Sequence, residues 1–174
     1  GAGSGIGKAV ALLFAKQGAA VHIIDLKEEN CEATLQEINS MGATAFMHVC
    51  DVTVQNEVKE IFNAIGAIDI LVNRAGISHI GSIESITEND LNRLYNVNIK
   101  GVYNCMQAAI SVMKKNKKGI ILNLASIAGS LGLSDRFAYS MTKGAVYAMT
   151  LSVARDYLHD GIRCNCVSPA RVHT

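Results

Sequence analysis

Apolar and polar residues along the chain form alternating helical and strand patterns. Residues 6–17 carry apolar side chains at helical spacing, and Gly18 follows them as a residue that commonly ends helices. Residues 19–25 are a short apolar run rich in β-branched residues, as expected of a strand buried on both faces. The same alternation predicts further helices at 27–41, 55–65, 88–113 and 137–158, and further strands at 44–50, 69–73, 119–126 and 162–167.

Strict alternation of apolar strands with helices predicts an α/β fold of the Rossmann type, with a doubly wound parallel sheet. Such sheets are usually wound around a first, central strand that leads into a glycine-rich loop. Here the loop GAGSGIG starts at residue 1, and the chain stops at Thr174 soon after a predicted strand. We therefore expect a fragment of a longer protein, a single domain over residues 1–174 without its first central strand and its C-terminal strand. A complete miniature fold is the alternative, but it would expose a central sheet edge.

The bulk composition narrows the classes of function. The chain has 174 residues, a formal net charge of +1 and 49% hydrophobic residues. Its longest apolar run, residues 9–15, is far shorter than the ~20 residues that cross a bilayer. The near-zero charge gives no reason to expect nucleic acid or an anionic membrane as a partner. Five scattered cysteines favour a reducing compartment over a disulfide framework, which points to the cytoplasm.

The opening loop has the spacing of a phosphate-binding loop. Gly1, Gly5 and Gly7 match G-x-x-x-G-x-G, whereas the isoleucine at position 6 breaks the spacing G-x-G-x-x-G. Glycine permits unusual backbone angles here and lets the backbone approach a pyrophosphate closely. The helix that follows offers free N–H groups and a partial positive charge to the same anion. Alone the loop is a weak signal for a dinucleotide, because small-residue turns are common.

A carboxylate strengthens that signal. Asp25 ends the next predicted strand, 20 residues after Gly5, where it can accept hydrogen bonds from the adenosine ribose. A 2′-phosphate would meet a like charge there, so the sequence favours NAD over NADP. Two alternatives stay open: Asp25 caps the helix that starts near Lys27, or Lys8 and Lys27 accept a 2′-phosphate.

A second group of residues suits proton transfer. Tyr139 and Lys143 are four residues apart in YSMTK, on one face of a predicted helix. Free tyrosine titrates near ~10, and an ammonium about 4 Å away at an effective dielectric near 20 favours a phenolate by about 4 kcal/mol. Ser126 ends a strand 13 residues before Tyr139, at the sheet edge where open α/β sheets bind ligands. We expect its hydroxyl group to orient a substrate carbonyl; the alternative is a serine that only turns the chain.

These motifs occur in one order: the glycine loop, Asp25, CDVT, NRAG, NVNIKG, Ser126, YSMTK and SPARVHT. Their order and spacing resemble the short-chain dehydrogenases/reductases along all 174 residues. The resemblance implies a dinucleotide-binding, catalytic domain that transfers a hydride between NAD(H) and an alcohol or carbonyl substrate. In such a reaction the cofactor carries the redox chemistry and the protein supplies position and electrostatics.

The resemblance also implies a role for each matching residue. Tyr139 is the general acid and base, Lys143 holds the nicotinamide ribose and favours the phenolate, and Ser126 orients the substrate. Asn98 holds a water that links Lys143 to solvent. The cofactor contacts implied are, besides Tyr139 and Lys143, Gly1, Ser4, Gly5, Ile6, Gly7, Asp25, Asp51, Val52, Asn73, Ala75, Gly76, Pro169, Val172 and Thr174, and no metal site is expected.

Two positions depart from the family pattern. Arg74 stands where the family usually has a second asparagine, and alanine replaces the glycine that usually follows Pro169. Arg171, together with Arg136, suggests an anchor for a substrate carboxylate, because a planar guanidinium suits that group. Either arginine can equally be a solvated surface residue. The surroundings resemble family members that act on hydroxy acids or sugar acids.

Three other functions compete with an NAD-dependent dehydrogenase. They are a non-catalytic NAD-binding protein on the same fold, an NADP-dependent carbonyl or 3-oxoacyl reductase, and an inactive remnant. The presence of Ser126, Tyr139 and Lys143 favours an enzyme, because a sensor does not need a perturbed phenol. Family members commonly form tetramers through two long helices, here 88–113 and 137–158, so we expect a homotetramer with a small-molecule substrate.

Overall fold

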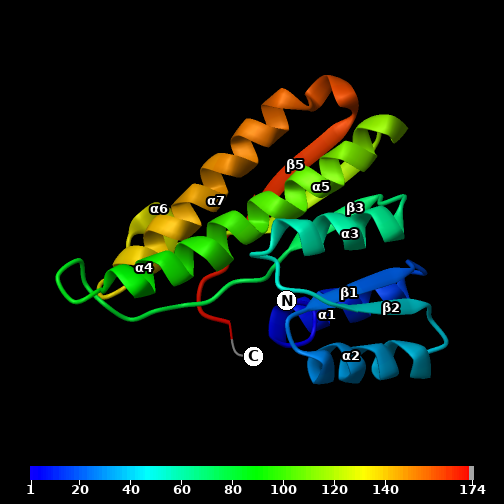
Figure 1. The fold of residues 1–174 in the computed structure, drawn as a ribbon, viewed down its shortest axis with the longest axis horizontal. Helices are drawn as coiled ribbons and strands as arrows, with labels where there is room; N and C mark the ends of the chain where they lie inside the picture. The colour runs from blue at the N-terminus through cyan, green and yellow to red at the C-terminus, as the bar shows by residue number, and fades with distance from the viewer. Residues whose placement is uncertain (173–174) are drawn as a thin grey trace. The chain divides into compact units, whose positions relative to one another are not determined.

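In the computed structural model, which describes residues 1–172, helices and strands alternate along the chain (Figure 1). The chain divides into two compact units, Gly1–Asp51 and residues 52–172. Each unit has its own parallel sheet, β1–β2 in the first and β3–β4–β5 in the second, and no strand within residues 1–172 joins them. The predicted α/β fold with parallel strands is confirmed, in two sheets rather than one. A single domain over residues 1–174 stays a prediction.

The first unit is built from two strand–helix pairs. Its elements are α1 (Gly5–Lys16), β1 (Val21–Asp25), α2 (Glu28–Ser40) and β2 (Ala45–Val49). Gly18 follows α1 with φ +83°, a conformation that suits glycine, as its predicted helix-ending role requires. β1 and β2 pair in parallel with Val21 opposite Ala45.

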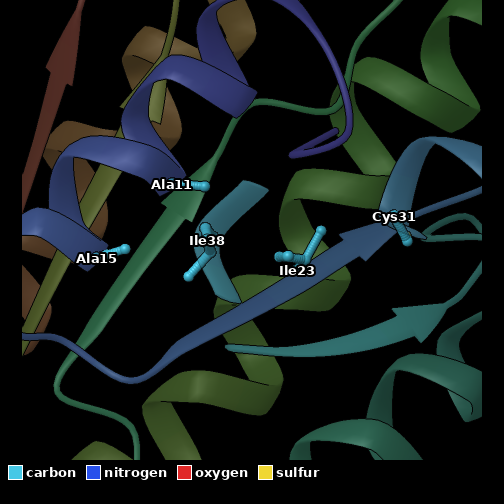
Figure 2. Close-up of a cluster of buried hydrophobic side chains, with 5 residues drawn as sticks. All are labelled: Ala11, Ala15, Ile23, Cys31 and Ile38. Atoms are coloured by element: carbon cyan, nitrogen blue, oxygen red, sulfur yellow. The ribbon is translucent and has the colours of Figure 1, made fainter. Parts of the chain in front are cut away.

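One face of this small sheet carries the core of the unit. Side chains alternate between the two faces along a strand. Ile23 of β1 points into a buried apolar cluster to which α1 and α2 also contribute side chains (Figure 2). The cluster consists of Ala11, Ala15, Ile23, Cys31 and Ile38. Ile23 is the one fully buried residue of β1, and Phe46 and Val49 of β2 are 48% and 50% exposed. The expectation of strands buried on both faces is wrong here, because α1 and α2 share one face.

The second unit holds a three-stranded sheet with β4 in the middle. Its elements are α3 (Gln55–Ile65), β3 (Ile70–Asn73), α4 (Glu88–Leu94), η1 (Tyr95–Lys100), α5 (Gly101–Asn116), β4 (Gly119–Leu124), α6 (Ala128–Leu131), α7 (Phe137–Asp156), η2 (Leu158–Asp160) and β5 (Ile162–Val167). Helix α5 contacts all three strands, whereas α7 contacts β4 and β5. Among the described helices, none combines the length and apolar character that a membrane span requires.

The predicted helix 88–113 is interrupted. α4 and α5 are joined by η1, a π-helical turn in which the N–H of Gly101 bonds to the carbonyl of Asn96, five residues earlier. A π turn widens the helix and is frequent at functional sites. Asn98, a proposed site residue, lies in this turn.

Candidate active site

Lys143 is the buried charge of the second unit. It lies one turn after Tyr139 on α7, and its Nζ is 5.9 Å from the centre of the Tyr139 ring. The Lys143 side chain is 7% exposed, and Nζ donates a 2.7 Å hydrogen bond to the carbonyl of Leu124, the last residue of β4. The bond fastens the middle of α7 to the carboxyl end of the central strand.

Burial and a second cation act together on Lys143. Burial, and to a lesser extent the positive charge of Arg74, lower the pKa of Lys143 from 10.5 to about 8. Neither side chain has a carboxylate partner among the ion pairs of the described residues. Arg74, which replaces the expected asparagine, therefore adds a second positive charge that disfavours the protonated form of Lys143.

The side chain of Asn98 is fully engaged within the protein. Its Nδ2 donates to the carbonyl of Ile77 at 2.9 Å and to Oγ1 of Thr142 at 3.0 Å, while its Oδ1 accepts from the amide of Ile77 at 2.8 Å. Gly76 lies directly beside this group, because a Cβ there would come within 3.2 Å of Asn98 Oδ1 and 3.5 Å of Lys143 Nζ. Gly76, Asn98 and Lys143, far apart in sequence, thus form one packed cluster.

Ser126 stands at the turn between β4 and α6. Its Oγ accepts a 3.2 Å hydrogen bond from the amide of Ala128, which is the turn-forming role named as the alternative. A hydroxyl that accepts in this way keeps its own hydrogen for another partner. The amide of Ile127 bonds to the carbonyl of Pro169, so the segment after β5 lies beside the same turn.

Asn73 points into the core rather than out of the sheet. Its Nδ2 donates to Oδ1 of Asn123, its register partner on β4, at 2.8 Å. Asn123 in turn donates to Oγ1 of Thr150 at 2.9 Å. All three side chains are buried, so this chain of hydrogen bonds ties β3, β4 and α7 together.

In the first unit, Asp25 organises the glycine loop. Its Oδ2 accepts from the amide of Gly3 at 3.1 Å, and its Oδ1 accepts from the amide of Lys27 at 3.3 Å. Partial burial raises the pKa of Asp25, whereas the two amide hydrogen bonds lower the pKa and favour the ionised form. Asp25 is therefore a carboxylate at neutral pH.

The loop itself is tightly packed at two glycines. A Cβ at Gly7 would collide with the backbone carbonyl of Gly1, and a Cβ at Gly3 would collide with Asn30 of α2. Thr34, also in α2 and fully buried, donates to the carbonyls of the loop at 3.4 Å. Helix α1 begins without a side-chain cap, so its first amides are open to an anion.

Comparison with known proteins identifies the family. Residues 1–174 match the family described as short chain dehydrogenase. The chain belongs to the short-chain dehydrogenase family. It is 43% identical to an uncharacterized oxidoreductase of Thermotoga maritima, over 97% of this chain and 68% of that protein.

Two solved dehydrogenase structures closely resemble this chain. An NAD⁺-bound xylitol dehydrogenase superposes with a TM-score of 0.95 at 32% identity, over 97% of this chain and 67% of the other. A gluconate 5-dehydrogenase from Burkholderia cenocepacia, in complex with NADP and tartrate, also superposes with a TM-score of 0.95. The two are 33% identical, over 100% of this chain and 70% of the other. The fold and the oxidoreductase family are therefore established, and relatives bind either nucleotide.

The predicted site residues of this short-chain dehydrogenase fall into two groups, one in each unit. The structure brings Gly76, Asn98, Tyr139 and Lys143 together in the second unit, with Ser126 two residues beyond the Lys143 contact on β4. In the first unit it joins Asp25 to the glycine loop. Val172 is exposed, and Thr174 lies outside the described residues.

Several residues of the site were missed from the sequence. They are Gly3, Asn30, Thr34 and Thr142. Only Gly3 carried a visible signal, as an additional glycine inside GAGSGIG. The others act through contacts between distant segments, for which no spacing rule exists.

Proposed function

We propose that the protein transfers a hydride between NAD(H) and an alcohol or carbonyl substrate, with Tyr139 as general acid and base. The observation that carries this proposal is the buried Lys143 ammonium beside the Tyr139 ring, fixed to the end of β4. A positive charge there stabilises the phenolate, so the phenol can exchange a proton near neutral pH. A non-catalytic NAD-binding protein would have no use for a buried ammonium that has no carboxylate partner within residues 1–172, because the burial of such a charge is costly.

The residues present fit a dinucleotide. In the first unit, the tightly packed glycines and the uncapped start of α1 suit a diphosphate. The ionised Asp25 suits a ribose. An ammonium has three N–H donors, and Lys143 spends one on Leu124; we assign the others to the ribose next to the nicotinamide. The bound cofactor supplies hydride transfer at its nicotinamide ring.

In the direction of oxidation, the Tyr139 phenolate would accept the proton of the substrate hydroxyl group, and a bound NAD⁺ would take the hydride from the carbon that bears this group. Ser126 donates its hydroxyl hydrogen to the substrate oxygen and so orients it. Reduction reverses both transfers.

The proton then needs a path to solvent. We assign the water-holding role of Asn98 to its backbone carbonyl, because its side-chain amide is already bonded to Ile77 and Thr142. A π turn disturbs the regular carbonyl pairing of a helix, which supports this assignment.

We propose NAD as the nucleotide. The two lysines named above as alternative acceptors of a 2′-phosphate lie near glutamates: Lys8 Nζ is 2.7 Å from Glu37, and Lys27 Nζ is 4.0 Å from Glu29. The Asp25 carboxylate would repel the extra phosphate. The remaining contacts proposed for the cofactor are Ile6, Asp51, Val52, Asn73, Ala75, Pro169, Val172 and Thr174. The side-chain Nδ2 of Asn73 already donates to Asn123.

The Asp25→Asn variant tests this choice of nucleotide. Asparagine keeps the size and a hydrogen-bond acceptor but removes the charge, so the ratio of the dissociation constants for NADP and NAD should fall roughly tenfold, the effect of about 1.4 kcal/mol. Fluorescence titration with both nucleotides measures it. Asp69→Asn, at an exposed carboxylate paired with Lys118, is the control and should leave the ratio unchanged. Tighter binding of NADP than NAD by the unaltered protein would contradict the proposal.

For the substrate, we propose a hydroxy acid whose carboxylate is held by Arg171, which is exposed after β5. Arg136 was expected to share this role, but its Nη1 already donates to Ser78 and His79. NADH formation across secondary alcohols, polyols and hydroxy acids tests the activity. Arg171→Ala should lower kcat/KM on a hydroxy acid much more than on its uncharged analogue, and an equal loss on both would remove the anchor.

We also propose a homotetramer in the cytoplasm. Phe137, Met141, Tyr147 and Leu151 leave an apolar strip on α7 that is 40–52% exposed, which is unusual for a monomer. Light scattering of the purified protein measures the mass, and a monomer would contradict the proposal.

A further inference from the structure

The segment from Ile77 to Gly81, which we call the 77–81 segment, is fastened at both of its ends. At its start, the amide and the carbonyl of Ile77 both bond to the Asn98 side chain. At its end, the amide of Gly81 donates to the carbonyl of Asp135 at 2.8 Å, and the amide of Phe137 donates to the carbonyl of Gly81 at 3.1 Å. The second pair of bonds forms a parallel bridge between Gly81 and Arg136, the residue directly before α7.

Arg136 binds the middle of the 77–81 segment. Its Nη1 donates to Oγ of Ser78 at 2.9 Å and to the carbonyl of His79 at 3.3 Å. The Arg136 side chain is half-buried, and both acceptors are neutral. Hydrogen bonds from a charged donor are stronger than those between neutral groups, so this contact holds the segment more firmly than the bridge alone.

The fastening acts on the part of α7 that carries Tyr139. Arg136 stands three residues before Tyr139, directly after Asp135, whose φ of +54° is unfavourable for a residue with a side chain. The carbonyl of Tyr139 accepts from Thr142, which in turn accepts from Asn98. The 77–81 segment is thus connected to the first turns of α7 at both of its ends.

We infer that Arg136 is a positioning residue, which holds the 77–81 segment against the start of α7 and so fixes the orientation of Tyr139 without touching the substrate. The effect on catalysis rests on the proposed function. The hydrogen bonds between the 77–81 segment and the start of α7 do not depend on that proposal. The positioning role also separates Arg136 from Arg171, because a positioning residue acts on every substrate, whereas a carboxylate anchor acts on acids alone.

Amide hydrogen exchange tests the fastening without any reaction. In Arg136→Gln the amides of Gly81 and Phe137 should exchange at least about tenfold faster, while amides in the middle of α5 keep their rates. Ser78→Ala, which keeps Arg136 and removes one acceptor, should show the same effect to a smaller extent. Unchanged exchange at Gly81 and Phe137 in both variants would overturn the inference, whether or not the protein is an NAD-dependent enzyme.

Kinetics then test the positioning. On an uncharged secondary alcohol that the unaltered protein oxidises, kcat of Arg136→Gln should fall about 10- to 100-fold, as for a catalytic group moved by about 1 Å. The dissociation constant for NAD should stay the same, and Ser78→Ala should lose a smaller part of kcat. A loss confined to carboxylate substrates, with Ser78→Ala fully active, would show a substrate anchor and overturn the inference. Absence of dinucleotide binding would instead refute the proposed function. The hydrogen-exchange result would then decide whether Arg136 holds the 77–81 segment.

Discussion

At the scale of single residues, the lowered pKa of Lys143 predicts that the proposed activity depends on pH. If the Tyr139 phenolate needs the Lys143 ammonium, kcat/KM should decline as pH rises through about 8, where this ammonium loses its proton. Stability should move in the opposite sense. The unfolded chain keeps the lysine protonated up to its ordinary pKa of 10.5, so between about 8 and 10.5 it binds more protons than the folded chain, and the contribution of Lys143 to stability rises with pH.

Arg74→Asn separates the two causes of this lowered pKa. The substitution removes a positive charge and leaves the burial of Lys143 in place, so the pKa should rise and the alkaline decline of kcat/KM should move to higher pH. A pH profile of both proteins measures the shift. Arg93→Asn, at a half-exposed residue beside Asp90, is the matched control. Profiles that coincide for the unaltered protein and Arg74→Asn would show that Arg74 does not act on the site.

The closeness of Tyr139 and Lys143 was predictable at this scale because the two residues share a short motif. Tyr139 and Lys143 are four apart on a helix, and that spacing alone puts them on one face. The partners of Asn98 were not predictable, because Ile77 and Thr142 are 21 and 44 residues away in sequence. Their contact depends on how the π turn faces α7, which local patterns do not encode.

At the scale of elements, α6 and α7 pack backbone to backbone. A Cβ at Gly129 would lie 2.6 Å from the amide nitrogen of Gly144 and 2.6 Å from the carbonyl carbon of Lys143, whereas a Cβ at Gly144 would approach only the carbonyl of Gly129, at 3.2 Å. Gly129→Ala should therefore push α6 off α7 and destabilise the protein by about 1–3 kcal/mol, as for other overpacked sites. Gly144→Ala should cost less. Urea unfolding compares the two, and an equal or reversed order would contradict this packing.

The β1–β2 pair contains a histidine contact that should respond to acid. His22 Nδ1 and His48 Nε2 are 2.9 Å apart, and burial, with the charge of His22 added at His48, lowers the pKa of both below 6.5. The unfolded chain then binds more protons just below pH 6.5, so stability present above that pH should be lost as pH falls through it.

Unfolding in urea at pH 7 and pH 5 measures this loss. His48→Gln removes one of the two titrating groups and the repulsion between them, so the variant should lose less stability over this interval than the unaltered protein. An equal loss in both would assign the acid sensitivity to other groups.

The elements themselves followed closely from apolar periodicity. β5, Ile162–Val167, has the predicted bounds, and most other elements differ by one or two residues at their ends. The π turn was not predicted, because the low helix propensities within Tyr95–Lys100 do not distinguish a π turn from a weak α-helix. It is set by tertiary contacts, including the two bonds between Asn98 and Ile77.

At the scale of the whole molecule, the order of the motifs predicted the family, and parallel strand pairing followed from the apolar strands. The burial of the strands was predicted less well from the sequence. β2 is an edge strand with one pairing partner, and Phe46 and Val49 remain about half exposed although the sequence reads as a buried strand. An apolar composition indicates that a strand can be buried. Which of its faces is covered depends on where the helices pack.

Tyr139→Phe tests the central claim most directly. Phenylalanine keeps the ring on α7 and removes the hydroxyl group, so NAD should bind as tightly as before while kcat/KM falls by about 10²- to 10⁴-fold, the usual contribution of a general acid and base. Tyr147→Phe, at a half-exposed tyrosine on the same helix, is the control and should keep full activity. Calorimetric titration with NAD, combined with NADH formation, gives both quantities. A Tyr139→Phe protein that retains the turnover of the unaltered enzyme would contradict the account.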